Sequence, residues 1–218
     1  MSLLLVTDER FLGHRAGSRH PEQPARLTAV LEGLDAAGID DAVIRRAPRV
    51  ADDVDLLAVH PLDHLQRLIA LDAKGGGRCD PDTVMGPDSW ATARLAAGAG
   101  LVAIDGLRAG DADLAFCAVR PPGHHATPDR SMGFCLLNNV AVAAMALAGA
   151  GQRVAIVDVD AHHGNGTQDV FYGDDRVLFV SCHQWPLYPG TGAADETGIG
   201  DGAGTTINVP LPPGAAGD

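Results

Sequence analysis

The sequence predicts an α/β protein with a three-layer α/β/α arrangement, in which a mostly parallel sheet is covered by helices on both faces. Short runs rich in Val, Leu and Ile alternate with longer segments whose apolar residues recur at helical spacing. Such alternation is typical of parallel strands joined by crossover helices, and strand runs that are apolar throughout fit burial on both faces. The 218 residues contain no internal repeat and no clear linker, so we expect a single domain over 1–218.

The N-terminal half is predicted to contain two strands and three helices. Leu27, Leu31 and Leu34 recur at helical spacing, and Gly38 is placed to end their helix. In chain order we expect a strand at 3–6, a polar loop at 11–24, a helix at 25–38, a short strand at 42–44, and helices at 56–73 and 89–108.

The C-terminal half is predicted to add four strands and a helix. The run LAFCAV leads directly into RPPGHHA, and VAIVDV leads into DAHHGNGTQ. Asn139 is placed to cap the helix that follows it. We expect strands at 114–119, 154–159 and 177–181, one more within 205–214, and a helix at 140–150.

Composition narrows the classes of partner. Apolar residues make up 46% of the chain, enough for a sizeable core, and 16 basic against 28 acidic residues give a net charge of −12. That sign opposes binding to nucleic acid, where Lys and Arg clusters supply much of the affinity. It suits a cationic small molecule or a basic peptide better.

The cysteines and apolar segments indicate a reducing, aqueous compartment. The four cysteines form no Cys-x-x-Cys pair, so neither a zinc ribbon nor a disulfide framework is expected. The apolar run at 3–6 is too short for a signal peptide, and the one at 140–150 is too short for a membrane span. We therefore expect a soluble cytoplasmic protein without membrane contact; the sequence does not indicate its oligomeric state.

Chemically reactive side chains gather where the strand at 154–159 ends. Asp158 and Asp160 are two apart, so they lie on the same side of a strand, and His162 follows directly. Two adjacent carboxylates repel each other unless a cation lies beside them. Oxygen and imidazole ligands without thiolate fit catalytic Zn²⁺, and also Mn²⁺ or Fe²⁺. The alternative is that the aspartates cap the following turn and the histidines are simply exposed.

A second group follows the strand at 114–119. Pro121 and Pro122 restrict the backbone, Gly123 permits close approach, and His124 and His125 are adjacent. Histidines can act as general base and acid near neutral pH. In open α/β sheets ligand sites gather at the carboxyl ends of strands, which places this pair near Asp158 and Asp160; the alternative is an ordinary surface loop.

Five segments together resemble the zinc-dependent histone deacetylase family. The likeness is greatest to its class II-type and bacterial members, which include the acetylpolyamine amidohydrolases, and it extends over about 20–213. The segments are HPEQPARL, RPPGHHA, GFCLLNNVAVAA, VDVDAHHGNGTQDVFY and HQWPLYPGTGAADETGIG. The resemblance implies the arginase/deacetylase fold.

The resemblance also implies roles for the reactive residues. Asp160 and His162 match two of the family's three metal ligands, and His124 and His125 match its tandem catalytic histidines. A metal of this kind lowers the pKa of water from about 15.7 toward 7 and polarises the acetyl carbonyl. The histidine pair takes up a proton and returns one to the leaving amine, and any pH profile belongs to the pair.

Residues behind the reacting groups are implied as well. Asp158 matches the carboxylate behind the first histidine, and Asn165 takes the place of the partner behind the second. Such partners fix the tautomer and basicity of a histidine. Asp158 and Ser181 also match ligands of a structural monovalent cation, usually K⁺.

The implied substrate is an acylated amine in a narrow channel. Gly133 and Phe134 match the wall of the channel that holds an acylated lysine chain, and we expect Tyr188 to face Phe134 across it. The implied reaction hydrolyses acetyl-lysine in peptides or proteins, acetylpolyamines or longer acyl amides to a carboxylate and a free amine. Two further carboxylates, Asp82 and Asp88, are weaker candidates for holding a substrate backbone or amine.

The sequence departs from the family's pattern after its NVPLPPG segment. The family's Ser-x-Gly-Phe-Asp strand, which carries the third metal ligand, and its Gly-Gly-Tyr segment are both absent. We therefore expect the N-terminal portion of a deacetylase domain, without the strands that bridge the two halves of the sheet. We also expect little amidohydrolase activity from this chain alone.

Two other functions remain open. An inactive acyl-lysine- or polyamine-binding protein would keep the pocket without the chemistry. The ureohydrolases share the architecture but use two manganese ions and an Asp-Ala-His-x-Asp pattern. In this sequence the position of the pattern's last Asp is occupied by Gly164, which has no carboxylate. Gly164 therefore argues against a binuclear site.

Overall fold

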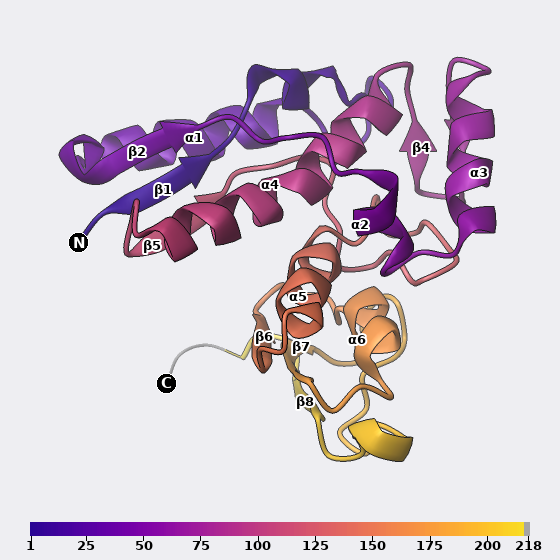
Figure 1. Cartoon of the computed structure of the whole chain (residues 1–218). Coiled ribbons are helices and arrows are strands. Elements are labelled where there is room, and N and C mark those ends of the chain that lie inside the picture. Colours follow the sequence, from indigo (N-terminus) through magenta and orange to yellow (C-terminus); the bar gives the residue numbers. More distant parts are fainter. Residues whose placement is uncertain (216–218) are drawn as a thin grey trace.

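A computed structural model of the chain describes residues 1–215 (Figure 1). The strands are β1 (Leu3–Val6), β2 (Val43–Arg46), β3 (Gly77–Arg78), β4 (Val84–Met85), β5 (Leu114–Cys117), β6 (Val154–Asp158), β7 (Val177–Gln184) and β8 (Thr206–Leu211). The α-helices are α1 (Ala25–Ala36), α2 (Asp53–Leu57), α3 (Leu62–Asp72), α4 (Ser89–Ala109), α5 (Asn139–Gly149) and α6 (Asn165–Phe171). Short 3-10 helices cover Glu9–Gly13, Asp40–Ala42 and Gly200–Gly202. No helix of the described residues has the length and apolar character needed to cross a bilayer.

The major strands form two separate parallel sheets. The first has the order β2-β1-β5 and the second the order β6-β7-β8, while β3 and β4 form a small antiparallel pair. Figure 1 shows the first sheet in the upper part of the molecule with α1 and α4, and the second below it with α5 and α6. The chain is therefore α/β with parallel sheets, as the sequence predicts.

The central strand of the first sheet, β1, is buried on both faces, which explains its continuous apolar run. Leu4, Leu5 and Val6 have no exposed surface. Leu4 and Val6 pack against Ala99 and Ala103 of α4, whereas the alternate residue Leu5 belongs to a different cluster that contains α1. Successive side chains of a strand point to opposite faces, so the two helices enclose this sheet between them.

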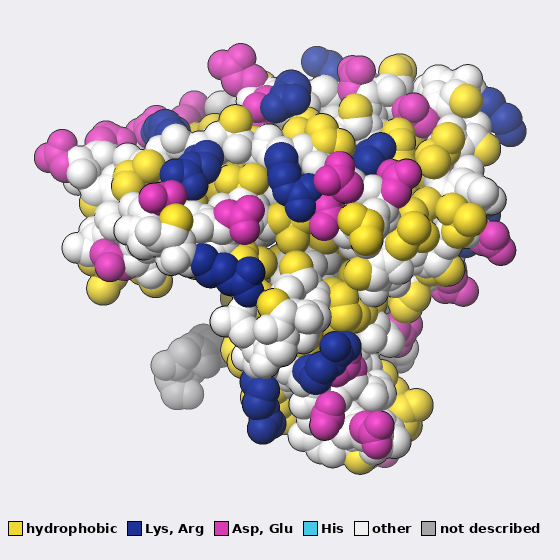
Figure 2. Space-filling model, in the orientation of Figure 1, with side chains coloured by type: hydrophobic (Ala, Val, Ile, Leu, Met, Phe, Trp, Pro, Cys, Tyr) yellow, Lys and Arg dark blue, Asp and Glu magenta, His cyan; other side chains and the backbone are white. Residues whose placement is uncertain are grey.

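The second sheet is covered more on one face than on the other within the described residues. Ile156 and Phe179 join a core with α4 and α5, whereas Val157 is 63% exposed and Leu178, Ile207 and Val209 are also exposed. On the face shown in Figure 2, acidic and basic side chains are intermixed, and no histidine of the described residues is visible. The reactive histidines thus lie away from this view.

Two predicted elements differ from the structure. The helix predicted at 56–73 is two helices, α2 and α3, because Pro61 precedes the first residue of α3 and cannot lie inside a helix. Asn138, not Asn139, caps α5: its side-chain oxygen accepts a hydrogen bond from Ala141 N at 3.1 Å. Asn139 instead donates to the Pro121 carbonyl at 3.0 Å, which ties α5 to the loop that carries His124.

A buried ion pair anchors the same loop. Arg120 donates from Nε and Nη2 to the two carboxylate oxygens of Glu22, both at 2.6 Å, and to the carbonyls of Phe11 and His14. His14 Nε2 lies 3.2 Å from the same carboxylate, without an aligned hydrogen bond. Burial raises the pKa of Glu22, but the His14 ring and the Arg120 guanidinium outweigh it and lower that pKa to about 2. The polar loop after β1 is thereby fixed to the end of β5.

Replacing Glu22 should destabilise the fold in a pH-dependent way. Glu22→Gln leaves the buried Arg120 charge without a partner, and we expect a loss of about 3–5 kcal/mol in the free energy of unfolding at pH 7. The folded-state pKa of Glu22 is lowered from 4.5 to about 2. Its stabilisation is therefore present above pH about 4.5 and is lost as the pH falls toward about 2. Urea unfolding at pH 7 and pH 3 measures this.

Asp35→Asn provides the matched control, because it breaks an exposed ion pair with Arg45 (3.0 Å). We expect a loss below about 1 kcal/mol there. The role of the buried pair would be contradicted if Glu22→Gln lowered the free energy of unfolding no more than the control does. It would also be contradicted if the loss caused by Glu22→Gln were as large at pH 3 as at pH 7.

Candidate active site

The site lies where the carboxyl ends of β5 and β6 converge from the two sheets. The loop after β5 carries His124 and His125, and the segment after β6 runs to Asn165 at the start of α6. Both contribute to a cavity of about 370 Å³ lined by Pro21, Arg26, Asp82, Pro122, His124, His125, Gly133, Phe134, Asp160, His162 and Tyr188. The residues proposed from the sequence as metal ligands, tandem histidines and channel wall thus line one space.

His124 is held between two carboxylates. Its Nδ1–H donates to Asp158 Oδ2 at 2.9 Å, and its Nε2 lies 3.9 Å from Asp160 Oδ1. Burial raises the pKa of Asp158, but the hydrogen bond and charge of His124, together with the Asp160 N–H, outweigh it and lower the pKa of Asp158 overall. Asp158 is therefore ionised near neutral pH and fixes the tautomer of His124.

His125 is held by an amide instead of a carboxylate. Its Nδ1–H donates to Asn165 Oδ1 at 2.8 Å, and the His124 and His125 rings lie 4.0 Å apart between centroids. Burial and the neighbouring His124 ring lower the pKa of His125 to about 4. His125 is therefore neutral at pH 7, with Nε2 as its proton acceptor.

Asp160 and His162 form the pair expected to bind a metal. His162 Nδ1 and Asp160 Oδ1 are 3.0 Å apart, and the His162 backbone N–H donates to the same oxygen at 2.8 Å. The side chains are 48% and 43% exposed, respectively, and both line the cavity. One carboxylate and one imidazole suit Zn²⁺, Mn²⁺ or Fe²⁺. Within residues 1–215 no cluster of three ligating side chains is present, so the donor types fit while their number is one short of the three that catalytic zinc generally has.

The channel-wall residues lie against the histidines. Gly133 has φ of +57°, and a Cβ there would collide with the His125 ring, so only glycine fits. Phe134 follows with φ of +70°, an uncommon conformation for a large residue, and its N–H donates to Thr83 Oγ1 at 3.0 Å. Its ring meets the edge of His20 at 4.6 Å.

Tyr188 closes another side of the same cavity. Its ring makes edge contacts with His125 (5.1 Å between centroids) and His162 (6.1 Å). Burial and the nearby Asp82 and Asp80 carboxylates raise the pKa of Tyr188 to about 12. The phenol is therefore neutral, and the expectation that it faces Phe134 across a bound acyl chain stays a prediction.

The end of β6 also meets β7 closely. Asp158 and Ser181 are direct partners in the register of the two strands, and Ser181 is fully buried with its Oγ 3.0 Å from His183 Nδ1. A Cβ at Gly164 would collide with the Asp158 carboxylate. A longer side chain at 164, such as the second-metal carboxylate of a ureohydrolase-type site, therefore does not fit this backbone. His163 is buried, with its ring nitrogens near Thr191 and Gln168.

The sequence analysis treated Asp82 and Asp88 alike, and it missed other residues that line the cavity. Asp82 lines the site cavity, but Asp88 lines a different cavity around Trp90, so Asp88 does not belong to the site. Pro21 and Arg26, which also line the cavity, were not anticipated, although HPEQPARL contains both. The Glu22–Arg120 pair was also missed, because its partners are 98 positions apart. The available signal was that each partner belongs to a recognised motif, Glu22 to HPEQPARL and Arg120 to RPPGHHA.

Comparisons with known proteins agree on one family. Residues 20–218 match the histone deacetylase domain. A probable deacetylase of Archaeoglobus fulgidus is 43% identical over 213 residues, which cover 96% of this chain and 59% of the relative. A histone deacetylase-like amidohydrolase of Pseudomonas aeruginosa is 44% identical over 207 residues, 93% of this chain and 54% of the relative.

A solved structure shares the fold. The crystal structure of the HDA15 HD domain superimposes with a TM-score of 0.91 at 39% identity, covering 96% of this chain and 61% of that one. The chain thus spans somewhat more than half the length of these relatives. With its fold and nearly all of its length matched, this chain belongs to the histone deacetylase domain family.

Proposed function

We propose that this chain carries active-site residues of a metal-dependent amidohydrolase that removes acetyl or other acyl groups from lysine side chains or polyamines. One observation carries the proposal: the His124–Asp158 and His125–Asn165 pairs meet Asp160 and His162 in a single cavity. The deacetylase and amidohydrolase names of its relatives support the same reaction class.

Asp160 and His162 would hold the divalent ion, Zn²⁺ or alternatively Fe²⁺ or Mn²⁺, with a further ligand from outside residues 1–215. When bound, such an ion supplies Lewis acidity, lowering the pKa of water and polarising an amide carbonyl. Asp158 and Ser181 are the proposed ligands of a structural K⁺, supported by their position as direct neighbours on β6 and β7.

The histidine pair would move the protons. His125 is neutral at pH 7 because its pKa is about 4, so its Nε2 is free to accept a proton from the attacking water. His124, fixed through Nδ1 by the ionised Asp158, would stabilise the positive charge that develops on the pair and share in returning a proton to the leaving amine. Both rings act as one unit because their centroids are 4.0 Å apart.

The cavity and its charge would select the substrate. Gly133, Phe134 and Tyr188 line it beside the histidines and would surround the aliphatic part of an acylated amine. Asp82 contributes a carboxylate to the same lining, and the chain carries a net charge of −12. These features favour substrates with additional positive charge, such as lysine-rich peptides or acetylpolyamines.

The most direct functional test is metal-dependent hydrolysis. The purified chain is incubated with a fluorogenic acetyl-lysine peptide, or with an acetylpolyamine, in the presence of Zn²⁺ or of a chelator. Because two metal ligands lie within residues 1–215, we expect a low rate, and the zinc-dependent difference is the readout. Asp160→Asn and His125→Ala should remove that difference, since general acid–base catalysis alone contributes about 10²–10⁴-fold.

Asp88→Asn is the matched control, because it changes an exposed carboxylate outside the site cavity. The proposal would be contradicted by a hydrolysis rate that is the same with zinc and with chelator, or by a zinc-dependent rate that is unchanged in both Asp160→Asn and His125→Ala. Acetyl-lysine binding without zinc-dependent hydrolysis would favour the second candidate, an acyl-lysine- or polyamine-binding protein, which the incomplete metal ligand set supports.

Titration of His125 tests the assigned proton positions. In the metal-free protein we expect the His125 ring to remain neutral until the pH falls to about 4. Asn165→Asp puts a carboxylate against Nδ1 and should raise the pKa of His125 by roughly one to three units. ¹H–¹⁵N NMR of the histidine rings measures both values, and unchanged His163 resonances verify the fold. A wild-type pKa near 6.5 would contradict the effect of burial and of His124 on this ring, and no increase in Asn165→Asp would show that the residue at 165 does not control it.

A further inference from the structure

A cluster of basic side chains stands out in a chain that carries a net charge of −12. Seven arginines lie within 3.0 Å of a carboxylate: Arg10 with Asp8, Arg45 with Asp35, Arg46 with Asp111, Arg49 with Asp55, Arg94 with Asp53, Arg120 with Glu22 and Arg176 with Asp174. This is the expected pattern for a protein with 28 acidic and 16 basic residues. A cavity lined by four cations, three of which have no carboxylate partner among the described residues, contrasts with this pattern.

This cavity has a volume of about 400 Å³ and lies between α3, the β3–β4 pair and the loop at 129–131. Four cationic side chains line it, from four separate segments: Arg67 of α3, Lys74 after α3, Arg78 of β3, and Arg130. Leu68, Leu71 and Cys79 contribute its apolar lining. The cavity shares no lining residue with the active-site cavity, so it is a separate site.

The cations retain unused binding capacity. Arg67 and Arg78 each donate to a backbone carbonyl, of Asp129 at 2.5 Å and of Pro81 at 2.7 Å, which leaves their charges uncompensated. The Asp80 carboxylate is 3.8 Å from Arg130. Lys74 forms no ion pair with any described residue.

One carboxylate also lines the cavity. Asp129 accepts a hydrogen bond from Thr127 Oγ1 at 3.2 Å. With Asp129 in the lining and Asp80 paired to Arg130, four positive charges face two negative charges at this cavity. The four cationic side chains are exposed to solvent, and their excess positive charge would attract an anion.

We propose that this cavity binds the phosphate group of a small phosphorylated molecule. Guanidinium groups bind phosphate oxygens in bidentate geometry, and lysine adds a point charge. A concave volume of about 400 Å³ with an apolar wall is in the range of small-molecule sites. Leu68 and Leu71 would contact the non-phosphate part of the ligand, which favours a small molecule over a flat peptide-binding surface.

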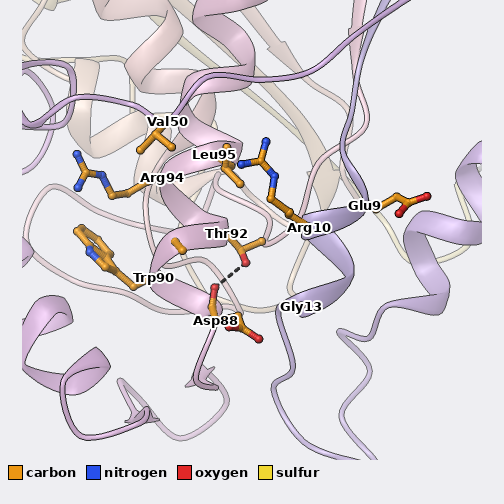
Figure 3. A pocket seen from close by; sticks show the side chains of 10 residues that line it. Glu9, Arg10, Gly13, Val50, Asp88, Trp90, Thr92, Arg94 and Leu95 are labelled. Carbon is orange, nitrogen blue, oxygen red and sulfur yellow. Dashed lines mark hydrogen bonds between the residues drawn. The ribbon is translucent and has the colours of Figure 1, made fainter.

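A larger cavity elsewhere in the described part of the chain lacks unpaired cationic side chains of this kind. About 660 Å³ in volume, it lies beside the start of α4, and Figure 3 shows Trp90 with Arg94 on one side and Arg10 with Glu9 on the other. Arg94 is bound to Asp53 and to the Ala51 carbonyl and lies over the Trp90 ring, and Arg10 is paired with Asp8. Both arginines of this cavity are already paired with carboxylates, so among the described residues the cavity offers no free cation to an anion.

Calorimetric titration with inorganic phosphate and pyrophosphate tests the proposal. At low salt we expect pyrophosphate to bind more tightly than phosphate, and added NaCl should weaken both. Lys74→Gln and Arg130→Gln should each weaken pyrophosphate binding at least about tenfold, because a charge-assisted hydrogen bond is lost. These two positions are chosen because neither holds a close hydrogen bond that the fold needs, and thermal unfolding confirms that each variant folds.

Arg153→Gln is the matched control, since Arg153 is exposed and outside the cavity; it should leave pyrophosphate binding unchanged. The proposal is overturned if pyrophosphate does not bind, if it binds equally to both cavity variants, or if Arg153→Gln weakens it as much as they do. Tighter binding of a phosphoserine peptide than of pyrophosphate would overturn the small-molecule assignment.

Discussion

Two side-chain hydrogen bonds link the two halves of this site, and no strand pairing joins the two sheets within the described residues. His124 bonds to Asp158 and His125 to Asn165, at 2.9 and 2.8 Å, and each bond connects the loop after β5 to the segment after β6. The Thr167 N–H, which donates to the His124 carbonyl at 3.1 Å, reinforces the same junction. The geometry of the proposed active site therefore depends on polar contacts between the segments that follow β5 and β6, and these contacts also stabilise the fold.

The different partners of the two histidines give them different electrostatic environments. An ionised carboxylate stands behind His124, whereas a neutral amide stands behind the more buried His125, whose pKa falls to about 4. Different partners, together with the deeper burial of His125, thus give two chemically identical rings different environments. Behind them, the Glu22–Arg120 ion pair and the Asn139–Pro121 contact hold the loop itself, so the site is supported from both the first strand loop and α5.

Much of this arrangement was predictable from the sequence, and the exceptions have physical causes. Strand and helix positions followed from periodicity, and the convergence of His124 with Asp158 followed from the rule that strand ends share one edge. The break at Pro61 was missed because flanking leucines keep a helical period across it. Asp82 and Asp88 look alike in sequence, and only the tertiary structure places one in the site cavity and the other beside Trp90. The division into two sheets depends on long-range pairing that local patterns do not contain, and only the family resemblance, with its missing bridging strands, led us to expect it.

The central claim is that Asp160 and His162 bind one divalent ion beside the two histidines. Anomalous X-ray scattering at the zinc edge, from crystals of the zinc-loaded protein, tests it most directly. The account predicts one strong peak about 2.0–2.2 Å from an Asp160 oxygen and a His162 nitrogen, within the cavity that His124 and His125 line. A peak at other histidines, or Asp160 and His162 turned away from each other with no metal between them, would contradict it.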